Sequence, residues 1–149
     1  MKILLASDHA GFDLKNKVKS VLIDEGFQIE DLGANVLVSD DDYPEIMLPV
    51  AMRVLDDSEN TKAIIFGKSG QGEAMIVNRF PGIRAIVYYS KNDDIIRLSR
   101  EHNDANILSI GAGFISENDA IDAIKLWIST PFSKDERHIR RIEQMDNIQ

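Results

Sequence analysis

One turn of this sequence combines the residue types that anion binding and proton transfer require. The apolar run 63–66 predicts a short buried strand, and the glycine-rich segment 67–72 (Gly-Lys-Ser-Gly-Gln-Gly) follows it directly. An apolar stretch that begins at Ala74 predicts a helix, so the turn would offer unpaired backbone N–H groups to an anion or a developing oxyanion. Glu73 adds a carboxylate, which a receptor for phosphate alone does not need but a proton-transfer site does. The residues leave one alternative open, a tight strand-to-helix turn in which Glu73 is only a favourable first-turn acid.

Two well-known phosphate-binding patterns are absent from this turn. The P-loop requires a glycine five residues before Gly67, and this chain has Lys62 there. The dinucleotide fingerprint requires a third glycine three residues after Gly72, where Met75 stands. Neither nucleotide-binding motif is therefore predicted.

Two polar residues follow the first predicted strand. Asp8 and His9 come directly after the apolar run 3–6. In an open parallel sheet this end of a strand is where ligands bind, so the two side chains are candidates for a site. The alternative is that Asp8 caps the next helix and that His9 is a solvated loop residue.

A second pair of candidates lies near the end of a predicted helix. Ile95, Leu98 and His102 recur at helical spacing and are expected to mark the apolar face of that helix. Taken alone, His102 would therefore be a core histidine satisfied by a hydrogen bond. Asn103 follows the helix end and could merely cap it.

The C-terminal region carries a basic helix in which two charges are uncompensated. Arg137 and Arg141 are four residues apart and so share one helix face, where like charges repel. Neither has an acidic residue three or four positions away, whereas Arg140 has both Glu136 and Glu143. A bound phosphate would compensate the pair, because a guanidinium fork matches phosphate oxygens. A salt bridge to a distant part of the fold is the alternative.

Composition and charge restrict the class of protein. The 149 residues suit one domain, expected to span positions 1–149, and 44% hydrophobic with 28% charged residues is typical of a soluble globular chain. No apolar run is long enough for a membrane span and no signal peptide is visible, so a cytoplasmic protein is expected. A net charge of −8 argues against binding to duplex nucleic acid. Zero cysteines exclude disulfides and thiolate chemistry, and with three histidines no structural zinc site is expected.

Apolar runs and apolar stripes alternate along the whole chain. Strands are expected at 3–6, 27–32, 63–66, 83–89 and 107–110. Helices are expected around the stripes 14–22, 46–55, 74–77, 95–102 and 120–128, with a last short basic helix over 137–141. This alternation predicts an α/β protein with a parallel sheet that is covered by helices on both faces. The acidic run 40–42 is expected to be a solvated loop that favours the N-terminus of the second helix.

Taken together, these motifs resemble the ribose-5-phosphate isomerase B and galactose-6-phosphate isomerase family of sugar-phosphate isomerases. The resemblance runs nearly end to end and includes the segments 7–11, 42–44, 69–73, 82–84, 100–106 and 137–141, with Asn78 and Gly111. It implies a Rossmann-like three-layer α/β/α sandwich with a five-stranded parallel sheet. It also implies a homodimer, or a tetramer built from it, with shared active sites and with no metal or cofactor.

The activity that the resemblance implies is the aldose–ketose isomerisation of a sugar phosphate. Ribose 5-phosphate and ribulose 5-phosphate are the leading pair, and a hexose 6-phosphate of the galactose or allose type is the alternative substrate. A sugar-phosphate-binding module without catalysis is the alternative from another class. One branch of the family carries a catalytic cysteine where this chain has Gly67, and another carries a glutamate at the position of Glu73. The absence of cysteine places the chain with the second branch.

The resemblance also assigns roles to individual residues. Glu73 would move the proton between C1 and C2 of the sugar. The enediolate oxygen would be stabilised by backbone N–H groups of the loop residues Ser69, Gly70, Gln71 and Gly72. Gly67 belongs to the same substrate-binding loop. Opening of the sugar ring would be assisted by Asp8 and His102. The sugar hydroxyls would be bound by Tyr43 and Asn103, and the phosphate by His9, Arg137 and Arg141.

Two positions depart from the family pattern. Lys68 occupies a loop position that is usually glycine, and Gly113 stands where ribose-phosphate members usually carry a phosphate-binding arginine. The missing arginine leaves both the phosphate position and the length of the preferred sugar open. Lys68 is a candidate to replace part of that charge.

The predicted topology separates the candidate residues into two groups. Asp8 and Glu73 follow strands, whereas His102 and Asn103 follow a helix and precede a strand, at the opposite edge of the sheet. Strands of about five residues, at roughly 3.3 Å per residue, put these edges about 17 Å apart. One sugar phosphate cannot bridge that distance, so the site is expected to combine residues from two chains.

Overall fold

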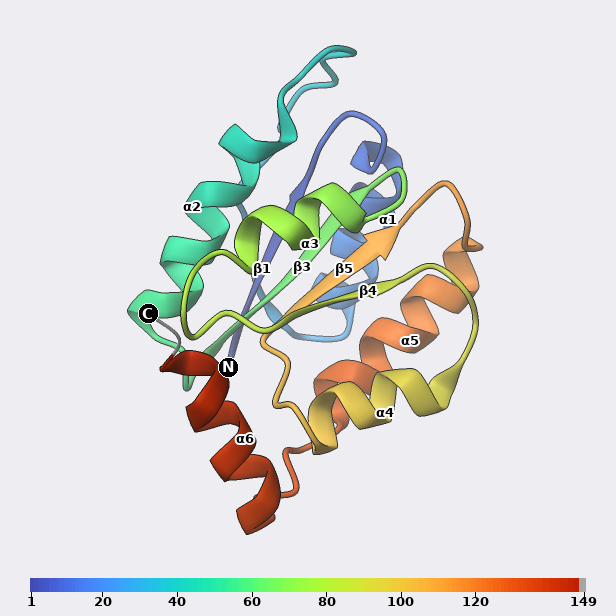
Figure 1. Cartoon of the computed structure of the whole chain (residues 1–149). Coiled ribbons are helices and arrows are strands. Elements are labelled where there is room, and N and C mark those ends of the chain that lie inside the picture. The colour runs from blue at the N-terminus through green and yellow to red at the C-terminus, as the bar shows by residue number, and fades with distance from the viewer. Residues whose placement is uncertain (148–149) are drawn as a thin grey trace.

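The computed structural model describes residues 1–147, in which strands and helices alternate along the chain (Figure 1). The strands are β1 (Lys2–Ser7), β2 (Gln28–Asp31), β3 (Thr61–Gly67), β4 (Ala85–Tyr88) and β5 (Ile107–Gly111). The helices are α1 (Phe12–Asp24), α2 (Tyr43–Asp56), α3 (Gln71–Val77), α4 (Asp93–Glu101), α5 (Glu117–Ser129) and α6 (Glu136–Asp146). The predicted alternation is confirmed. Within residues 1–147, no helix combines the length and the apolar character needed to cross a membrane.

The strands form one parallel sheet in the order β2-β1-β3-β5-β4. This arrangement confirms the predicted α/β class with a five-stranded parallel sheet. The three central strands are buried along nearly their whole length, as their apolar sequences predict. Their register aligns Ser7 with Phe66, and Gly67 with Gly111. The carboxyl ends of β1, β3 and β5 therefore meet at one edge, and the segments that follow them lie side by side.

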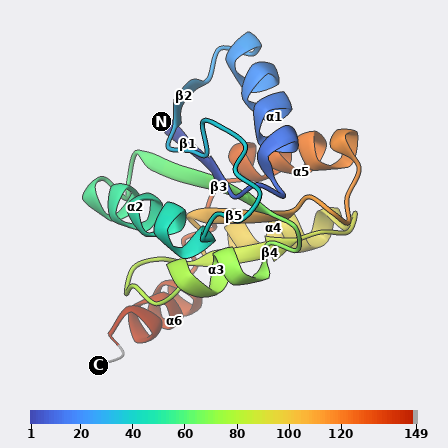
Figure 2. The same cartoon turned by 90° about the horizontal axis from the view of Figure 1, so that it is seen from above.

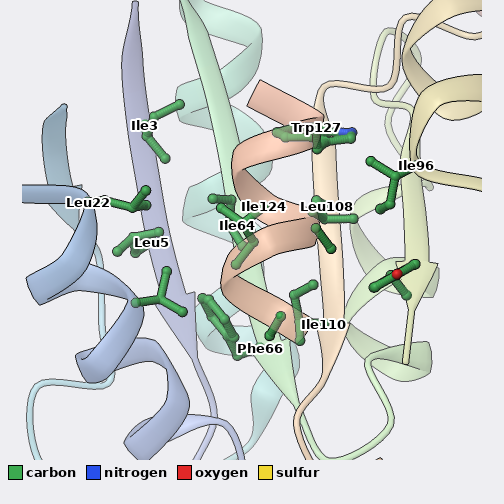
Figure 3. Close-up of a cluster of buried hydrophobic side chains, with 14 of the residues drawn as sticks. Ile3, Leu5, Leu22, Ile64, Phe66, Ile96, Leu108, Ile110, Ile124 and Trp127 are labelled. Atoms are coloured by element: carbon green, nitrogen blue, oxygen red, sulfur yellow. The ribbon is translucent and has the colours of Figure 1, made fainter. Parts of the chain in front are cut away.

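Helices cover both faces of the sheet, which confirms the three-layer arrangement. Figure 2 shows α1 and α5 on one side of the sheet, and α2 and α3 on the other. One buried apolar cluster joins α1, α4 and α5 to the sheet and includes Ile96, Leu108 and Trp127 (Figure 3). A second cluster joins α2 and α3 to the opposite face through residues such as Met47 and Val77. Each helix layer therefore has its own core, and the sheet lies between the two.

The prediction that Ile95 and Leu98 mark the buried apolar face of α4 is wrong. Ile95 and Leu98 are 47% and 41% exposed, whereas Ile96 is fully buried in the core. Arg100 lies on the buried side, where its guanidinium group donates hydrogen bonds to backbone carbonyls of two other segments. Because these bonds satisfy the buried charge, a polar residue can occupy the inner face of α4 while the apolar stripe points outward.

Strand β4 is shorter than the predicted run 83–89. A turn with Gly82 at a φ of +88° precedes it. The backbone N–H group of Arg84 then donates to the side chain of Asn106 at 2.8 Å rather than to a neighbouring strand. The strand therefore begins only at Ala85.

Helix α6 lies at the edge of the sheet where the strands begin (Figure 1). Asp146, its last residue, accepts a hydrogen bond from the backbone N–H group of Gly82 and pairs with Arg84 at 3.2 Å. These contacts attach the basic helix to the turn before β4. The helix is thus placed opposite the edge where the glycine-rich loop lies.

Candidate active site

The glycine-rich loop between β3 and α3 is held in place by the chain that leaves β5. The backbone N–H groups of Ala112 and Gly113 donate to the carbonyl oxygens of Gly67 and Lys68, both at 2.9 Å. These bonds continue the pairing of β3 with β5 beyond the ends of the two strands. The loop therefore begins as an extension of the sheet rather than as a free segment.

Gly70 turns the loop into α3. Its φ of +74° lies in the left-handed region, where a residue with a Cβ is strained. The hydroxyl of Ser109 in β5 donates to its carbonyl oxygen at 2.6 Å, and a Cβ on this glycine would lie 3.0 Å from that hydroxyl oxygen. The hydroxyl of Ser69 accepts the backbone N–H group of Gln71 at 3.3 Å. The sequence from 69 to 71 therefore fits this turn through both backbone conformation and close packing.

The side chain of Glu73 folds back over the first residue of the loop. A Cβ placed on Gly67 would overlap its carboxylate group. The residue is only 4% exposed, so the carboxylate lies in a largely enclosed place at the end of β3. Gly67 therefore provides the space in which the candidate base lies.

The environment of Glu73 changes its acidity. Burial raises the pKa of the carboxyl group, the charge of nearby Asp8 raises it further, and the residue's own backbone N–H group acts in the opposite direction. A carboxylate in such a place holds a proton at a higher pH than an exposed one does. This property suits a group that must both accept and return a proton.

Asp8 serves the turn before α1 as well as the candidate site. One of its carboxylate oxygens accepts the backbone N–H group of Gly11 at 3.0 Å, and the side chain is buried. Helix α1 has Gly11 at its N-cap and no side-chain cap hydrogen bond, so the alternative that Asp8 caps this helix is wrong. Asp8 instead stabilises the turn before the helix, and its charge acts on Glu73. A Cβ on Gly11 would lie 2.5 Å from backbone atoms of Phe66, so glycine lets the start of α1 approach the end of β3.

The interpretation of the acidic run 40–42 as a solvated loop is wrong for Asp41. One oxygen of its carboxylate lies 2.6 Å from Nδ1 of His9 and also accepts the backbone N–H group of that histidine at 3.2 Å. The ligating atoms of Asp8, His9 and Asp41 all lie within 4.8 Å of one another. The hydrogen bond accounts for the proximity of His9 and Asp41, and Asp8 directly precedes His9 in the chain.

Tyr43 reaches the glycine-rich loop from α2. A Cβ on Gly72 would lie 2.7 Å from Cζ of the tyrosine ring and 2.8 Å from its hydroxyl oxygen. The phenol group therefore lies directly against the loop, where it could reach a sugar bound there. Glycine at position 72 leaves the room for this contact.

The other predicted site residues lie at the edge where the strands begin. His102 follows α4 and is half-buried, and its ring lies against that of His138 with the centroids 4.2 Å apart. Burial lowers the pKa of His138, and the charges of His102 and Arg137 lower it further. Asn103 is exposed beside this pair.

The two arginines on α6 are exposed at the same edge. Arg137 lies 3.8 Å from Asp135, an acid two residues before it, so the expectation that its charge has no local partner is wrong. Exposed ion pairs of this kind contribute little stability, and the guanidinium group can exchange partners. Arg137 and Arg141 therefore remain accessible to an anion.

The predicted residues thus form two groups at opposite edges of the sheet. Asp8, Glu73, Tyr43 and the glycine-rich loop come together at the carboxyl ends of the strands. The histidine that follows α4 and the arginines of α6 lie at the other edge. A cavity of 550 Å³ at this edge is lined in part by Asn103 and by Asp146 at the end of α6. Strand β3 has seven residues, so at roughly 3.3 Å per residue the two edges are about 20 Å apart.

Two residues of these groups were not predicted from the sequence. Asp41 carries no local signal that separates it from Asp40, because its contact with His9 joins positions 32 residues apart. His138 gives a weak signal, since it is the one histidine in the basic run 137–141. Its burial against His102 depends on how α6 packs, which the run itself does not determine.

The fold and the loop together define a class of protein, an α/β protein with a buried carboxylate and a glycine-rich loop at the carboxyl edge of a parallel sheet. The comparison with known families is consistent with this class. The family described as Ribose/Galactose Isomerase matches residues 3–145. The chain belongs to this family, which confirms the resemblance noted from its motifs.

Individual relatives match over nearly the whole chain. The chain is 37% identical to ribose-5-phosphate isomerase B from Mycolicibacterium paratuberculosis over 143 residues, which cover 96% of this chain and 88% of the relative. The structure of the ribose 5-phosphate isomerase from Thermotoga maritima matches with a TM-score of 0.90 at 37% identity, and the match covers 99% of this chain and 98% of that one. Ribose-5-phosphate isomerase B from Mycoplasma genitalium, solved with bound ribulose-5-phosphate, matches with a TM-score of 0.91 at 30% identity over 97% of this chain and 93% of that one.

Proposed function

We propose that this protein is an aldose–ketose isomerase that interconverts ribose 5-phosphate and ribulose 5-phosphate. Relatives named for this activity match nearly the whole chain, and one was solved with bound ribulose-5-phosphate. The observation that carries the proposal is the buried carboxylate of Glu73, seated on Gly67 beside Asp8. Such a carboxylate is suited to move a proton between neighbouring carbons.

Glu73 is the base in the proposed reaction. It takes the proton from C2 of the open-chain aldose and returns it to C1, while the proton of the C2 hydroxyl moves to the C1 oxygen. The raised pKa of Glu73 suits both half-steps, because a base with a pKa nearer the working pH accepts and releases a proton more readily. The electrons stay within the substrate, so the proposed reaction needs no redox cofactor.

The backbone N–H groups of residues 69–72 are the proposed donors to the enediolate oxygen. The hydrogen bonds from Ala112 and Gly113 hold the start of this loop in one conformation. Donors that are already in place stabilise a developing negative charge without first reorganising. This argument supports the loop as the oxyanion-binding part of the site.

Each proposed site is built by two chains of a homodimer. One chain contributes Asp8 and Glu73, and the other contributes His102 and Asn103, since the two groups lie too far apart within one chain for a single sugar phosphate. Asp8 and His102 assist opening of the sugar ring in this arrangement. The phosphate is bound by His9 of the first chain and by the two arginines on α6 of the second. A two-fold symmetric dimer contains two such sites.

The proposal is tested by NMR of aldose phosphates incubated with the protein in D2O. Ribose 5-phosphate is expected to yield ribulose 5-phosphate with deuterium at C1, because the base exchanges its proton with solvent. Glu73→Gln should bind the sugar but abolish both signals. Saturable binding without ketose or deuterium in the wild-type protein would instead indicate a non-catalytic binding module. Turnover of galactose or allose 6-phosphate alone would assign the activity to hexose phosphates.

A further inference from the structure

The loop that leads from β2 to α2 contributes a carboxylate to His9. One oxygen of Asp41 lies 2.6 Å from Nδ1 of the imidazole ring and accepts the backbone N–H group of the same residue at 3.2 Å. The aspartate side chain is only 12% exposed, whereas that of the histidine is 39% exposed. One carboxylate therefore fixes both the backbone and the ring of His9 and leaves part of the ring open to solvent.

This contact determines which nitrogen of the ring is free. An ionised carboxylate only accepts hydrogen bonds, so Nδ1 must carry a proton to bond with Asp41. The remaining nitrogen, Nε2, is then the one that is free to contact a ligand. When the ring is protonated, Nε2 also carries a proton and can donate it to an anion.

The acids around His9 also favour its charged form. The hydrogen bond to Asp41 has the largest effect in raising the pKa of His9, and the charges of Asp8 and Asp40 act in the same direction. Within the described residues, no lysine or arginine pairs with Asp41, so the imidazolium is the cation that balances its charge. Partial burial of the ring opposes the shift.

A phosphate monoester needs such a cation at neutral pH. Its second ionisation occurs at about pH 6, and an ordinary histidine loses its charge at about pH 6.5. Without a nearby acid, the imidazole ring would therefore be neutral over most of the pH range in which the phosphate is a dianion. In the proposed dimer, the positive charges of the two arginines on α6 of the second chain would also lower the pKa of His9.

We propose that Asp41 is a positioning residue for the substrate phosphate, which holds the ring of His9 with Nε2 free for the phosphate and keeps that ring cationic. The inference rests on the proposed function, in which His9 binds the phosphate of the sugar. Asp41 itself does not contact the substrate in this scheme. Its effect should therefore be visible in how phosphate binding depends on pH.

The experiment combines an NMR titration of the histidine rings with calorimetric binding of inorganic phosphate at pH 6.5 and pH 8.5. The protein has three histidines, so the His9→Gln variant identifies the signal of His9. Asp41→Asn should lower the pH at which His9 titrates, and should weaken phosphate binding about tenfold at pH 8.5, as loss of one charged hydrogen bond does. The loss at pH 6.5 should be clearly smaller, because the ring is then partly charged without help. Asp41→Glu keeps the charge and should recover part of the affinity.

Asp40→Asn is the matched control, since it removes the same charge one residue away without a hydrogen bond to His9. It should change the titration of His9 and the affinity for phosphate much less than Asp41→Asn does. In the His9→Gln background, Asp41→Asn should cause no further loss of affinity.

An unchanged titration of His9, or an equal loss of phosphate affinity at both pH values, would overturn the proposal and make Asp41 a structural residue. If the wild-type protein isomerised no aldose phosphate, the proposed function would fail, but these two measurements would still decide the role of Asp41.

Discussion

The carboxylate of Glu73 occupies the space that a side chain at position 67 would fill. A carboxylate reaching back from α3 and a side chain at the end of β3 therefore exclude each other. A catalytic cysteine at this position, as in the other branch of the family, would compete for the same space. A residue without a side chain at position 67 is thus needed for the proposed base at position 73.

Gly67→Ala is expected to lower kcat about a hundredfold or more, because a displacement of a catalytic group by roughly 1 Å has an effect of that size. The backbone itself tolerates alanine there, since the φ of Gly67 is not positive. Steady-state kinetics and circular dichroism of the variant provide the measurement.

Gly26→Ala is the control, because this glycine has a φ of +86° but no atom within 4 Å of an added Cβ. It should reduce stability by roughly 1–2 kcal/mol, the cost of the left-handed conformation for a residue with a Cβ, and leave kcat unchanged. If the Gly67→Ala variant had the same kcat as the wild-type protein, the base would lie elsewhere.

Glu73→Gln is expected to lower kcat by about a hundredfold to ten-thousandfold, the range for loss of a general base. Steady-state kinetics of the variant measure this loss.

Glu73→Gln should also alter the pH dependence of the free energy of unfolding. The pKa of Glu73 is raised in the folded state, so ionisation above the unfolded-state value of about 4.3 costs folding free energy. The wild-type protein should therefore lose stability relative to the variant as the pH rises from about 4 through the folded-state pKa. Urea denaturation should show equal stability of the two proteins near pH 4 and a more stable variant at pH 7. A stability difference that does not change with pH would contradict this account.

Mixed dimers test whether two chains share each site. Glu73→Gln and His102→Ala should each be nearly inactive alone. Refolded together at equal amounts, half of the dimers are mixed and one of their two sites is intact, so about a quarter of wild-type activity should return. The control mixes Glu73→Gln with Asp8→Asn, which lie in the same half of the site and should recover no activity. Demonstrated exchange of subunits without recovery in the first mixture would rule out shared sites of this composition.

Lys68 and Gly113 are neighbours in the structure. A Cβ on Gly113 would lie 3.1 Å from Cγ of Lys68, and the backbone N–H group of Gly113 donates to the lysine carbonyl at 2.9 Å. The stem of the lysine therefore uses room that an arginine side chain at position 113 would need. The two cations are alternatives at this place.

Lys68→Gly is accordingly expected to raise KM for a sugar phosphate about tenfold, in line with loss of one charged hydrogen bond. The double variant Lys68→Gly/Gly113→Arg should restore KM, whereas Gly113→Arg alone should bring little gain. Values of kcat/KM for five-carbon and six-carbon phosphates would be measured for all three variants. A constant ratio of these values, with an unchanged KM, would show that neither position contacts the phosphate.

The fold and the first half of the candidate site were predictable from the sequence because their signals are local. A run such as 63–66 predicts a buried strand by itself, and the glycines that follow mark the loop. The opposite placement of His102 also followed from chain order, since a residue before a parallel strand must lie at its starting edge. The face of α4 was not predictable in this way. Whether Ile95 or Ile96 points inward depends on the hydrogen bonds that let Arg100 be buried, and these come from a distant segment.

The role of Asp41 was hidden for a related reason. Three consecutive acids look alike in composition, and only the path of the loop brings one of them to His9. The packing of His138 against His102 likewise depends on where α6 returns to the sheet. Contacts between segments far apart in the chain have no periodic pattern from which to be read.

The attachment of the glycine-rich loop to β5 also limits how the protein can move during turnover. A lid must swing away from the sheet, and swinging residues 67–70 away would break the bonds from Ala112, Gly113 and Ser109 together. These residues should therefore stay in place during turnover, and in the proposed reaction the sugar would rest against them. Water must be excluded and product released by parts of the assembly other than this loop, and slow opening of the loop should not set the rate.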